Sequence, residues 1–227
     1  MPDGARSGAG QLPLVIPHEA AQERDDFLVG PSNEAAFRLI DSWPDWSAPV
    51  TLLAGPVGAG KSHLTHVWQS RSNARRIAAS TLGRIDPTEL VATGAVAVED
   101  AGRGIDQTAL FHLLNAARAG SAHVLITARS WPQAWGLTLP DLASRLRAAT
   151  PVEILEPDDG LLGRVLVKLF SDRQIDIDPA VVDYLVVRME RSLAAAERLV
   201  DALDRTSLAR GRRITRPLAA EVMAGMG

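Results

Sequence analysis

One glycine-rich segment constrains the fold of this chain more than any other feature. A short apolar run at residues 50–54 leads directly into it, and a helical pattern over about residues 61–70 follows it. The segment has the spacing Gly-x4-Gly-Lys-Ser, in which backbone N–H groups and a helix N-terminus can surround a phosphate. Its residues are Gly55, Pro56, Val57, Gly58, Ala59, Gly60, Lys61 and Ser62. The order strand, loop, helix therefore predicts a phosphate-binding loop.

Each residue type in this loop has a chemical role. The glycines permit positive φ and let the backbone approach a phosphate closely. Lys61 would place a positive charge against the β- and γ-phosphates, and the Ser62 hydroxyl would bind Mg²⁺. We include the next residue, His63, in the predicted cofactor site. The expected cofactors are ADP or ATP together with Mg²⁺.

Strand-like and helix-like patterns alternate over residues 21–157. An arrangement of this kind predicts an α/β domain with a parallel sheet that helices cover on both faces. We expect the first helix to be N-capped by Ser32 or Asn33 and to end before Pro44. The expected strands are 50–54, 76–79, 94–98, 123–127 and 152–155, and the expected helices are 34–43, 61–70, 86–90, 106–118 and 142–149.

The pattern changes to helices alone after residue 157. Expected helices at 158–173, 179–190, 192–209 and 216–225 indicate a small, all-helical C-terminal lid domain over residues 158–227. At the other end, residues 1–20 are expected to form a tail ahead of the α/β domain, and residues 1–10 are expected to be flexible.

Polar residues follow two of the predicted strands. Glu99 and Asp100 come at the end of one strand, where acids would face the phosphate loop across a parallel sheet. One would join the Mg²⁺ shell and the other would orient a water molecule, and the sequence leaves open which acid does which. Thr127 or Ser130, at the end of another strand, could contact the γ-phosphate.

Composition excludes several classes of protein. The chain has 227 residues, 46% of them hydrophobic, so disorder is not expected. It contains no cysteine, which excludes disulfides and thiol catalysis. The net charge of −3 gives no general signal for nucleic-acid binding. Apolar runs fall short of the roughly 20 residues of a membrane span, so we expect no membrane partner and a cytoplasmic location.

These motifs together resemble the AAA+ proteins of the DnaA family, and most closely the short regulatory homologues of the Hda type. The resemblance covers roughly residues 11–209. It is carried by residues 27–36 (FLVGPSNEAA), the phosphate loop, residues 96–100, the strand before Thr127, and residues 139–146 (LPDLASRL). It implies the AAA+ fold, with Leu28 and Val29 beside the base of the nucleotide.

The resemblance also assigns a role to an arginine. Arg145 looks like the AAA+ arginine finger, which reaches a nucleotide on a neighbouring subunit and stabilises developing charge. Arg147, two residues further on, would face away on a helix. A DnaA-like lid also has a second sensor arginine, at a position that Ala194 takes here. Arg198, one turn later, is the expected substitute; without it, weak ATPase activity and a preference for ADP follow.

The Hda-type resemblance further implies partners. Its members bind the β sliding clamp of DNA polymerase III through a short N-terminal motif, which residues 11–16 (QLPLVI) resemble. Gln11 would donate hydrogen bonds, and Leu12, Leu14 and Ile16 would be apolar anchors. No DNA-binding helix-turn-helix domain is expected after the lid, so DNA would be met only through the clamp. The implied function is negative regulation of replication initiation, in which ATP hydrolysis by DnaA is stimulated.

Other functions stay open at this level. A DnaA-like or helicase-loader-like ATPase would bind nucleic acid directly, and residues 71–84, with their arginines, are the one candidate stretch. A P-loop kinase or other small-molecule enzyme would need a substrate pocket. Since AAA+ proteins often pair head to tail, a homodimer or small oligomer is expected to form.

Overall fold

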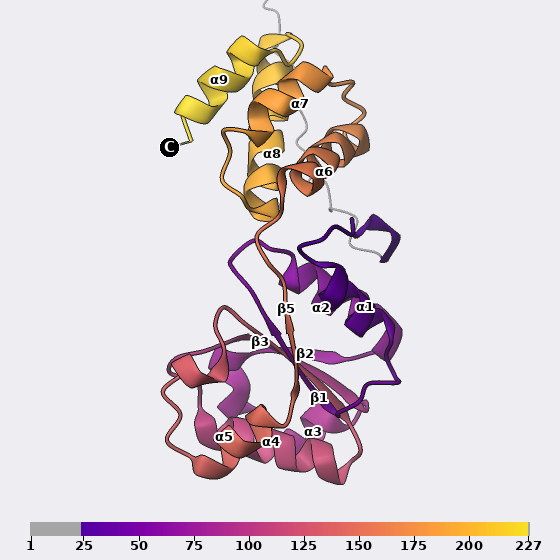
Figure 1. Ribbon diagram of the computed structural model, residues 1–227, viewed down its shortest axis with the longest axis vertical. Coiled ribbons are helices and arrows are strands. Elements are labelled where there is room, and N and C mark those ends of the chain that lie inside the picture. The colour runs from indigo at the N-terminus through magenta and orange to yellow at the C-terminus, as the bar shows by residue number, and fades with distance from the viewer. Residues whose placement is uncertain (1–23, 227) are drawn as a thin grey trace, which may run out of the picture.

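Five parallel strands form one sheet in the computed structural model, which describes residues 24–226 (Figure 1). Their order is β2-β3-β4-β1-β5. The strands are β1 (Val50–Ala54), β2 (Arg75–Ala78), β3 (Ala95–Ala101), β4 (His123–Ala128) and β5 (Thr150–Glu153). The predicted α/β class with a parallel sheet is therefore confirmed. The largest boundary shift among the strands is at β3, which ends three residues later than expected, and β5 begins two residues earlier than expected.

Helices cover both faces of the sheet. Successive side chains of a strand point to opposite faces, so Leu52 packs into one apolar core and Leu53 into the other. The Leu53 side is covered by α1 (Glu34–Asp41) and α2 (Lys61–Ser72). The Leu52 side is covered by α3 (Pro87–Val91), α4 (Gln107–Ala119) and α5 (Pro140–Arg147). Short 3-10 turns lie at Arg24–Asp26, Ala79–Arg84 and Pro132–Ala134.

The start of α1 differs from the prediction. Asn33 occupies the N-cap position, but its side chain does not cap the helix. Instead its Oδ1 accepts a hydrogen bond from the N–H of Gly30 (2.8 Å) and its Nδ2 donates to the carbonyl of Leu28 (3.0 Å). The buried amide of Asn33 thus fixes the bend of the segment before the helix, and that bend orients Leu28.

Four helices form the C-terminal lid, as expected. They are α6 (Asp159–Asp172), α7 (Pro179–Val186), α8 (Leu193–Arg210) and α9 (Arg216–Ala224), and they enclose an apolar core of their own. Asp158 and Ser192 begin two of them by accepting hydrogen bonds from the N–H groups of Leu161 (2.7 Å) and Ala195 (3.2 Å). These caps satisfy helix N–H groups that have no partner within the helix.

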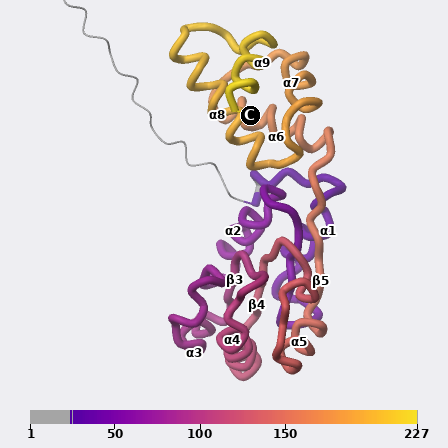
Figure 2. The backbone as a smooth tube through the Cα atoms, turned by 90° about the vertical axis from the view of Figure 1, so that its left-hand side faces the viewer, coloured from indigo at the N-terminus to yellow at the C-terminus, as the bar shows by residue number. Residues whose placement is uncertain are grey.

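The lid lies at one end of the molecule, beyond the carboxyl ends of the strands. Figure 2 shows the chain running along β5 and straight into α6, which brings the lid over the N-terminus of α2. Helices α4 and α5 lie at the opposite end (Figure 1). Within residues 24–226 we find no helix with the length and apolar character needed to cross a membrane.

Candidate functional site

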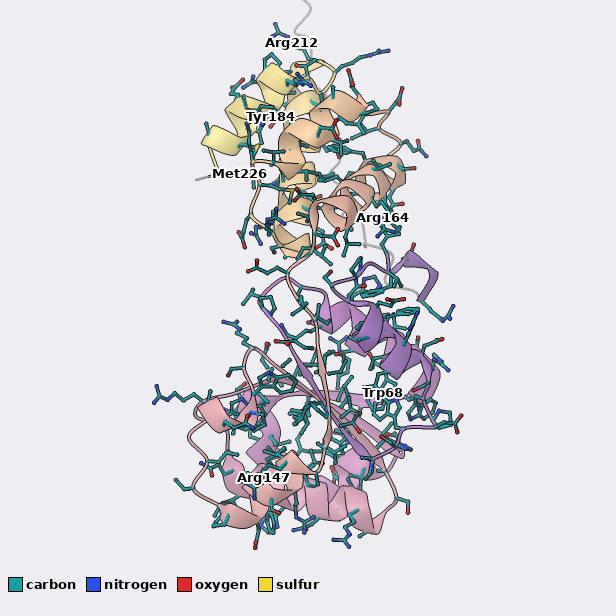
Figure 3. The ribbon with its side chains drawn as sticks, in the orientation of Figure 1. Trp68, Arg147, Arg164, Tyr184, Arg212 and Met226 are labelled. Carbon is teal, nitrogen blue, oxygen red and sulfur yellow. The ribbon has the colours of Figure 1, made fainter. Side chains whose placement is uncertain are left out.

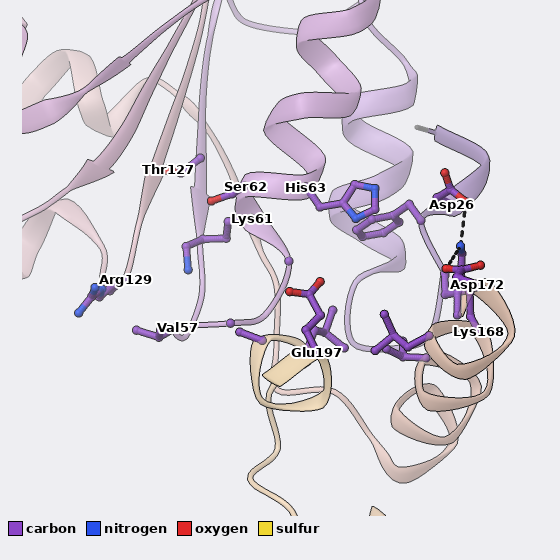
Figure 4. A pocket seen from close by; sticks show the side chains of 18 of the residues that line it. Asp26, Val57, Lys61, Ser62, His63, Thr127, Arg129, Lys168, Asp172 and Glu197 are labelled. Atoms are coloured by element: carbon purple, nitrogen blue, oxygen red, sulfur yellow. Dashed lines mark hydrogen bonds and ion pairs between the residues drawn. The ribbon is translucent and has the colours of Figure 1, made fainter. Parts of the chain in front are cut away.

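A cavity of about 420 Å³ lies between the phosphate-binding loop and the lid. Figure 4 shows its two ends. Lys61, Ser62, Thr127 and Arg129 lie at one end, and Asp26, Lys168 and Asp172 lie at the other. The first group comes from the sheet body and the second mainly from lid helix α6, so the cavity depends on both parts of the chain. Ligands of open α/β sheets bind at this edge, where the strands end.

The glycine-rich loop has the backbone that its sequence predicts. Gly58 and Gly60 have φ values of 71° and 102°, which residues with a Cβ rarely adopt. Gly58 also lies directly under the lid, because its carbonyl accepts a hydrogen bond from the N–H of Leu193 at 2.8 Å. A Cβ at Gly58 would come within 2.1 Å of Ser192 Oγ. The loop and the start of α8 are therefore packed against each other.

Lys61 is the buried cation of the cavity. The residue is 8% exposed, and its Nζ donates to the carbonyls of Gly55 and Pro56, both at 2.7 Å. Burial lowers the pKa of Lys61, the nearby charge of Asp100 opposes that shift, and Arg129 adds to it. These contacts hold the ammonium at the mouth of the loop, where phosphate oxygens could replace the two carbonyls as acceptors.

The two acids at the end of β3 point in different directions. Asp100 lines the cavity and has a positive φ of 57°. Glu99 is turned toward the edge strand, where its carboxylate pairs with Arg76 at 2.8 Å, and it does not line the cavity. Of the alternatives left open by the sequence, the geometry favours Asp100 as the acid beside the loop.

Thr127, at the end of β4, lies beside Asp100. Its buried Oγ1 accepts a hydrogen bond from the N–H of Asp100 at 3.2 Å, and it lines the cavity. Ser130 does not line the cavity, whereas Arg129 does. Arg129 was not among the predicted site residues, although its position two residues after Thr127 could have suggested it.

The segment before α1 contributes only part of what was expected. Leu28 lines the cavity, but Val29 instead packs against the core beneath α1 and α2. Phe27 lines it too, and its ring contacts His63 edge-on, with 5.1 Å between the ring centroids. The ring of Phe27 thus holds His63 at the wall of the cavity.

Lid helix α8 presents a carboxylate to the cavity. Ala194 and Glu197 line it, whereas the expected substitute cation, Arg198, lies outside and pairs with Glu190 at 3.5 Å. Figure 4 shows the Glu197 carboxylate directed toward the loop. Burial, and secondarily the charge of Asp201, raises the pKa of Glu197. The lid therefore offers no arginine from this helix to a terminal phosphate.

At the far end of the cavity, one lysine bridges two acids. Lys168 Nζ lies 2.9 Å from Asp26 Oδ1 and 2.9 Å from Asp172 Oδ2. Burial pulls the pKa of Lys168 down, but its hydrogen bonds to Asp26 and Asp172 and the negative charges of these two acids outweigh burial and raise that pKa above its usual value. Sequence reasoning missed all three residues, because Asp26 is more than a hundred positions away from α6.

Arg145 does not line the chain's own cavity. It lies on α5, and its guanidinium carbon is 5.0 Å from the centroid of the Phe111 ring, a cation–π distance. Arg147 is more exposed (Figure 3), at the end of the molecule away from the lid. The placement of Arg145 leaves it available to a second molecule.

The predicted site residues thus divide into two groups. Those that line the cavity are Leu28, Val57, Gly58, Gly60, Lys61, Ser62, His63, Asp100 and Thr127. Those that do not line it are Val29, Gly55, Pro56, Ala59, Glu99, Arg145 and Arg198, although Gly55 and Pro56 bind Lys61 through their carbonyls. The predicted clamp motif, with Gln11, Leu12, Leu14 and Ile16, lies outside the described residues.

The candidate nucleic-acid stretch, residues 71–84, has most of its arginines engaged within the fold. Arg71 binds Asp41 at 3.0 Å, Arg75 donates to the carbonyl of Glu89 (3.3 Å), and Arg76 pairs with Glu99. Arginines that are already paired offer little to phosphates, so this stretch gives weak support to direct nucleic-acid binding.

A Mg²⁺ ion would be held here by few protein groups. Among residues 24–226 there is no cluster of three or more His, Asp or Glu side chains suited to a metal. Mg²⁺ bound with a nucleotide needs only one or two protein oxygens, since phosphates and water complete its shell. Ser62 and Asp100, which line the same end of the cavity, fit that requirement.

Comparisons with known proteins agree with this architecture. Residues 163–223 match the family model described as Hda, lid domain. An uncharacterized protein of Haemophilus influenzae is 26% identical over 231 residues, which cover 94% of this chain and 98% of that protein.

Two solved structures share the fold over most of this chain. Domain III of the replication initiation protein DnaA from Thermotoga maritima has a TM-score of 0.75 at 18% identity, with 90% of this chain and 96% of that chain covered. AMPPCP-bound DnaA from Aquifex aeolicus has a TM-score of 0.68 at 18% identity, with 81% of this chain and 65% of that chain covered. Identities this low establish the fold alone.

Proposed function

We propose, from the premise that this chain is an AAA+ protein related to Hda and DnaA, that it negatively regulates the initiation of chromosomal replication. In this proposal it binds a nucleotide in its own cavity, attaches to the β sliding clamp, and stimulates ATP hydrolysis by DnaA. The observation that carries the proposal is the position of Arg145, which lies outside the chain's own nucleotide cavity on a helix of the sheet body.

The chain's own nucleotide is proposed to be ADP or ATP with Mg²⁺. Lys61 would hold the phosphates by charge and the N–H groups of the loop would donate to them. Ser62 would bind the metal, which balances phosphate charge, and Asp100 would orient its water shell. Because α8 presents Glu197 instead of an arginine, we propose that the chain is at most a weak ATPase and that its nucleotide is chiefly structural.

Arg145 is proposed to act on the nucleotide of DnaA. An arginine that reaches a phosphoryl group from a neighbouring subunit stabilises charge that develops during transfer. The ring of Phe111 holds the guanidinium against the protein surface, which limits the conformations that Arg145 has to give up on docking. Arg145 is therefore a positioned donor, while hydrolysis takes place at the partner's site.

Attachment to the clamp is proposed to run through Gln11, Leu12, Leu14 and Ile16. A short extended segment with alternating apolar anchors is a recurrent way of entering a partner's pocket. Attachment would bring the chain to DNA-loaded clamps, so DNA is met only indirectly. This part of the proposal rests on the sequence motif alone.

One assay tests the central step. ATP-bound DnaA, DNA-loaded clamp and the full chain are mixed, and hydrolysis of the ATP on DnaA is followed. We expect Arg145→Ala to lower the stimulation at least tenfold, since arginine fingers contribute on the order of 10³–10⁵ to such rates. Arg147→Ala, an exposed arginine on the same helix, is the matched control and should stimulate like the wild type.

Clamp attachment is tested separately. Binding of the full chain to purified β clamp is measured for wild type and for a Gln11→Ala/Leu14→Ala double variant, and only the wild type should bind.

Each assay has an outcome that contradicts the proposal. Equal stimulation of DnaA by wild type and Arg145→Ala would exclude the arginine-finger role of Arg145. Equal clamp binding by wild type and the double variant would exclude residues 11–16 as the clamp motif.

A further inference from the structure

The outer end of the lid is a basic surface. Residues 205–216 contain five arginines and no acid, although the whole chain has a net charge of −3. Arg210 pairs with Glu221. The exposed side chains of Arg212 and Arg213 make no hydrogen bond or ion pair with any described residue. Figure 3 shows Arg212 at the end of the lid away from the sheet body. Two arginines are therefore available there to an acidic partner.

An exposed leucine lies in the same segment. Leu208, near the end of α8, is 70% exposed, and Arg205 lies three residues earlier on the same face of the helix. The N–H of Arg212 donates to the carbonyl of Ser207 at 3.2 Å, which folds the chain after the helix back against its last turn. Nucleic-acid phosphates gain nothing from a leucine, whereas protein interfaces combine an apolar centre with arginines. This surface therefore favours a protein partner over DNA.

A groove elsewhere on the lid has the opposite charge. It lies between α6, α7 and the segment that joins them, and it encloses about 1150 Å³. Val167 lines it and is 50% exposed, and Ile175 adds a partly buried apolar side chain. Asp176 and Asp183 line it too, and their carboxylates make no hydrogen bond or ion pair with any described residue. The groove thus combines an apolar centre with two unpaired acids.

The remaining charged groups of the groove do not cancel those acids. Asp159 pairs with Arg191 at 2.7 Å, and Asp172 pairs with Lys168 at 2.9 Å. Four acids and two cations line the groove in all, namely Asp159, Asp172, Asp176, Asp183, Arg164 and Lys168. The groove is therefore negative overall, and it suits a partner that presents cations around an apolar side chain.

We propose that the outer end of the lid of one molecule docks into this groove on a second copy of the chain. Leu208 would lie against Val167. Arg212 and Arg213 would pair with the two unpaired acids of the groove. Each surface supplies the charge and the apolar contact that the other lacks. Because two different surfaces meet, the contact is head to tail, and it continues from molecule to molecule unless the rotation closes a ring.

This contact is separate from the proposed action on DnaA. The altered residues of the tests below include neither Arg145 nor the phosphate loop, so the inference does not depend on the proposed function. Exposed ion pairs contribute little each and are screened by salt, while burial of apolar surface is less sensitive to salt. The association is therefore expected to be weak and to decrease as salt is added.

Sedimentation velocity on the full chain without nucleotide provides the first measurement. At low salt, the weight-average mass should rise as the protein concentration increases from about 1 to 200 µM. At about 0.5 M salt, the mass should fall back toward that of the monomer. A wild-type chain that stays monomeric throughout this range at low salt would overturn the proposal.

Charge reversal identifies the two surfaces. The variant Arg212→Asp/Arg213→Asp makes the outer end of the lid negative, and the variant Asp176→Arg/Asp183→Arg makes the groove positive. Each variant alone should be monomeric, because like charges would then meet. An equimolar mixture of the two should associate again, since every contact between unlike variants joins opposite charges. Renewed association in the mixture also shows that both variants are folded.

Two control variants match these changes. Arg103→Asp/Arg118→Asp reverses two exposed arginines of the sheet body and should associate like the wild type. Leu208→Ser should weaken the association about tenfold through the loss of apolar burial. Val187→Ser should not, although Val187 is 74% exposed, because it lines neither surface.

The other outcomes contradict the inference. If the reversed variants associate like the wild type, these two surfaces do not form the contact. If the mixture stays monomeric while each variant is folded by circular dichroism, charge pairing between the surfaces is excluded. If Arg212→Asp/Arg213→Asp loses affinity for a DNA duplex but self-associates like the wild type, the arginines bind DNA and the inference is overturned. In each case the tests of Arg145 and of the clamp motif are unaffected.

Discussion

Single residues in this chain carry tight steric constraints, and Gly58 is the tightest. It combines a positive φ of 71° with a lid side chain so close that a Cβ would lie 2.1 Å from Ser192 Oγ. It also accepts the hydrogen bond of Leu193. Gly58 therefore shapes the phosphate loop and also forms the contact between that loop and the start of α8.

Gly58→Ala should weaken both nucleotide binding by the loop and the packing of the lid on it. We expect a loss of about 1–3 kcal/mol in the free energy of unfolding, from backbone strain and displacement of α8, and at least a tenfold loss of ADP affinity. Thermal unfolding and ADP titration measure these effects. Gly136→Ala is the matched control, because Gly136 has a φ of 72° but no atom within 4 Å of an added Cβ. Gly136→Ala should lose stability without losing ADP affinity. If both variants lost ADP affinity equally, the special role of Gly58 in the phosphate loop would be contradicted.

His123 makes a prediction about pH. It lies among tryptophans, with its ring centroid 6.1 Å from that of Trp43 and 5.7 Å from that of Trp46. Burial lowers the pKa of His123 below its usual value of 6.5. The unfolded chain therefore binds a proton on His123 more readily than the folded chain does. The contribution of neutral, buried His123 to the free energy of unfolding is complete above about pH 6.5, and it is lost as the pH falls toward the folded-state pKa.

The free energy of unfolding, followed by tryptophan fluorescence between pH 8 and pH 5, should thus decline on the acid side. In His123→Phe, which keeps an aromatic ring in the cluster, that part of the decline should disappear. An unchanged decline in the variant would show that other groups cause it.

At the scale of elements, the caps of the lid helices differ in what they contribute. Ser192 begins α8 with a side-chain hydrogen bond to the N–H of Ala195, whereas Thr215, at the start of α9, makes no such bond. Ser192→Ala should lower the free energy of unfolding by about 1 kcal/mol, and Thr215→Ala by clearly less. Chemical denaturation of both variants provides the comparison. Equal losses would mean that the Ser192 bond is not the source of the effect.

The sequence was sufficient for the elements and for half of the cavity. Apolar runs, helical periodicity and the Gly-x4-Gly-Lys-Ser spacing are local signals, and they predicted the strands, the lid helices and the loop with Lys61 and Ser62. Glu99 shows where this reasoning ends. Whether it or Asp100 faces the loop depends on the register shift between Val98 and Ala101 against β4 and on the partner strand that supplies Arg76.

The other half of the cavity is made of contacts between distant parts of the sequence. Glu197, Lys168 and Asp172 line the cavity only because α6 and α8 fold back over the sheet body, and local periodicity gives no information about that arrangement. Asp26 is brought to Lys168 by the bend before α1, which the side chain of Asn33 holds. A pattern read residue by residue along the chain cannot show such pairings.

At the scale of the whole molecule, the cavity is shared by the sheet body and the lid. A ligand that binds only the folded form stabilises it by mass action, by about 2.7 kcal/mol at a hundredfold excess over its Kd. For a chain of this size, ADP with Mg²⁺ should therefore raise Tm by roughly 5–10 °C. Differential scanning fluorimetry measures the shift, and Lys61→Ala should abolish it without changing the Tm of the ligand-free protein by a similar amount.

The hydrogen bond from Leu193 to the carbonyl of Gly58 has a mechanical consequence. It joins the first turn of a long lid helix to the loop that would hold the phosphates, and the rest of α8 extends from this joint to the outer end of the lid (Figure 1). A tilt of helix α8 would therefore be transmitted through this hydrogen bond to the phosphate loop. A protein that binds the outer end of the lid and tilts α8 would change the conformation of the phosphate loop from a distance, without contacting the nucleotide itself.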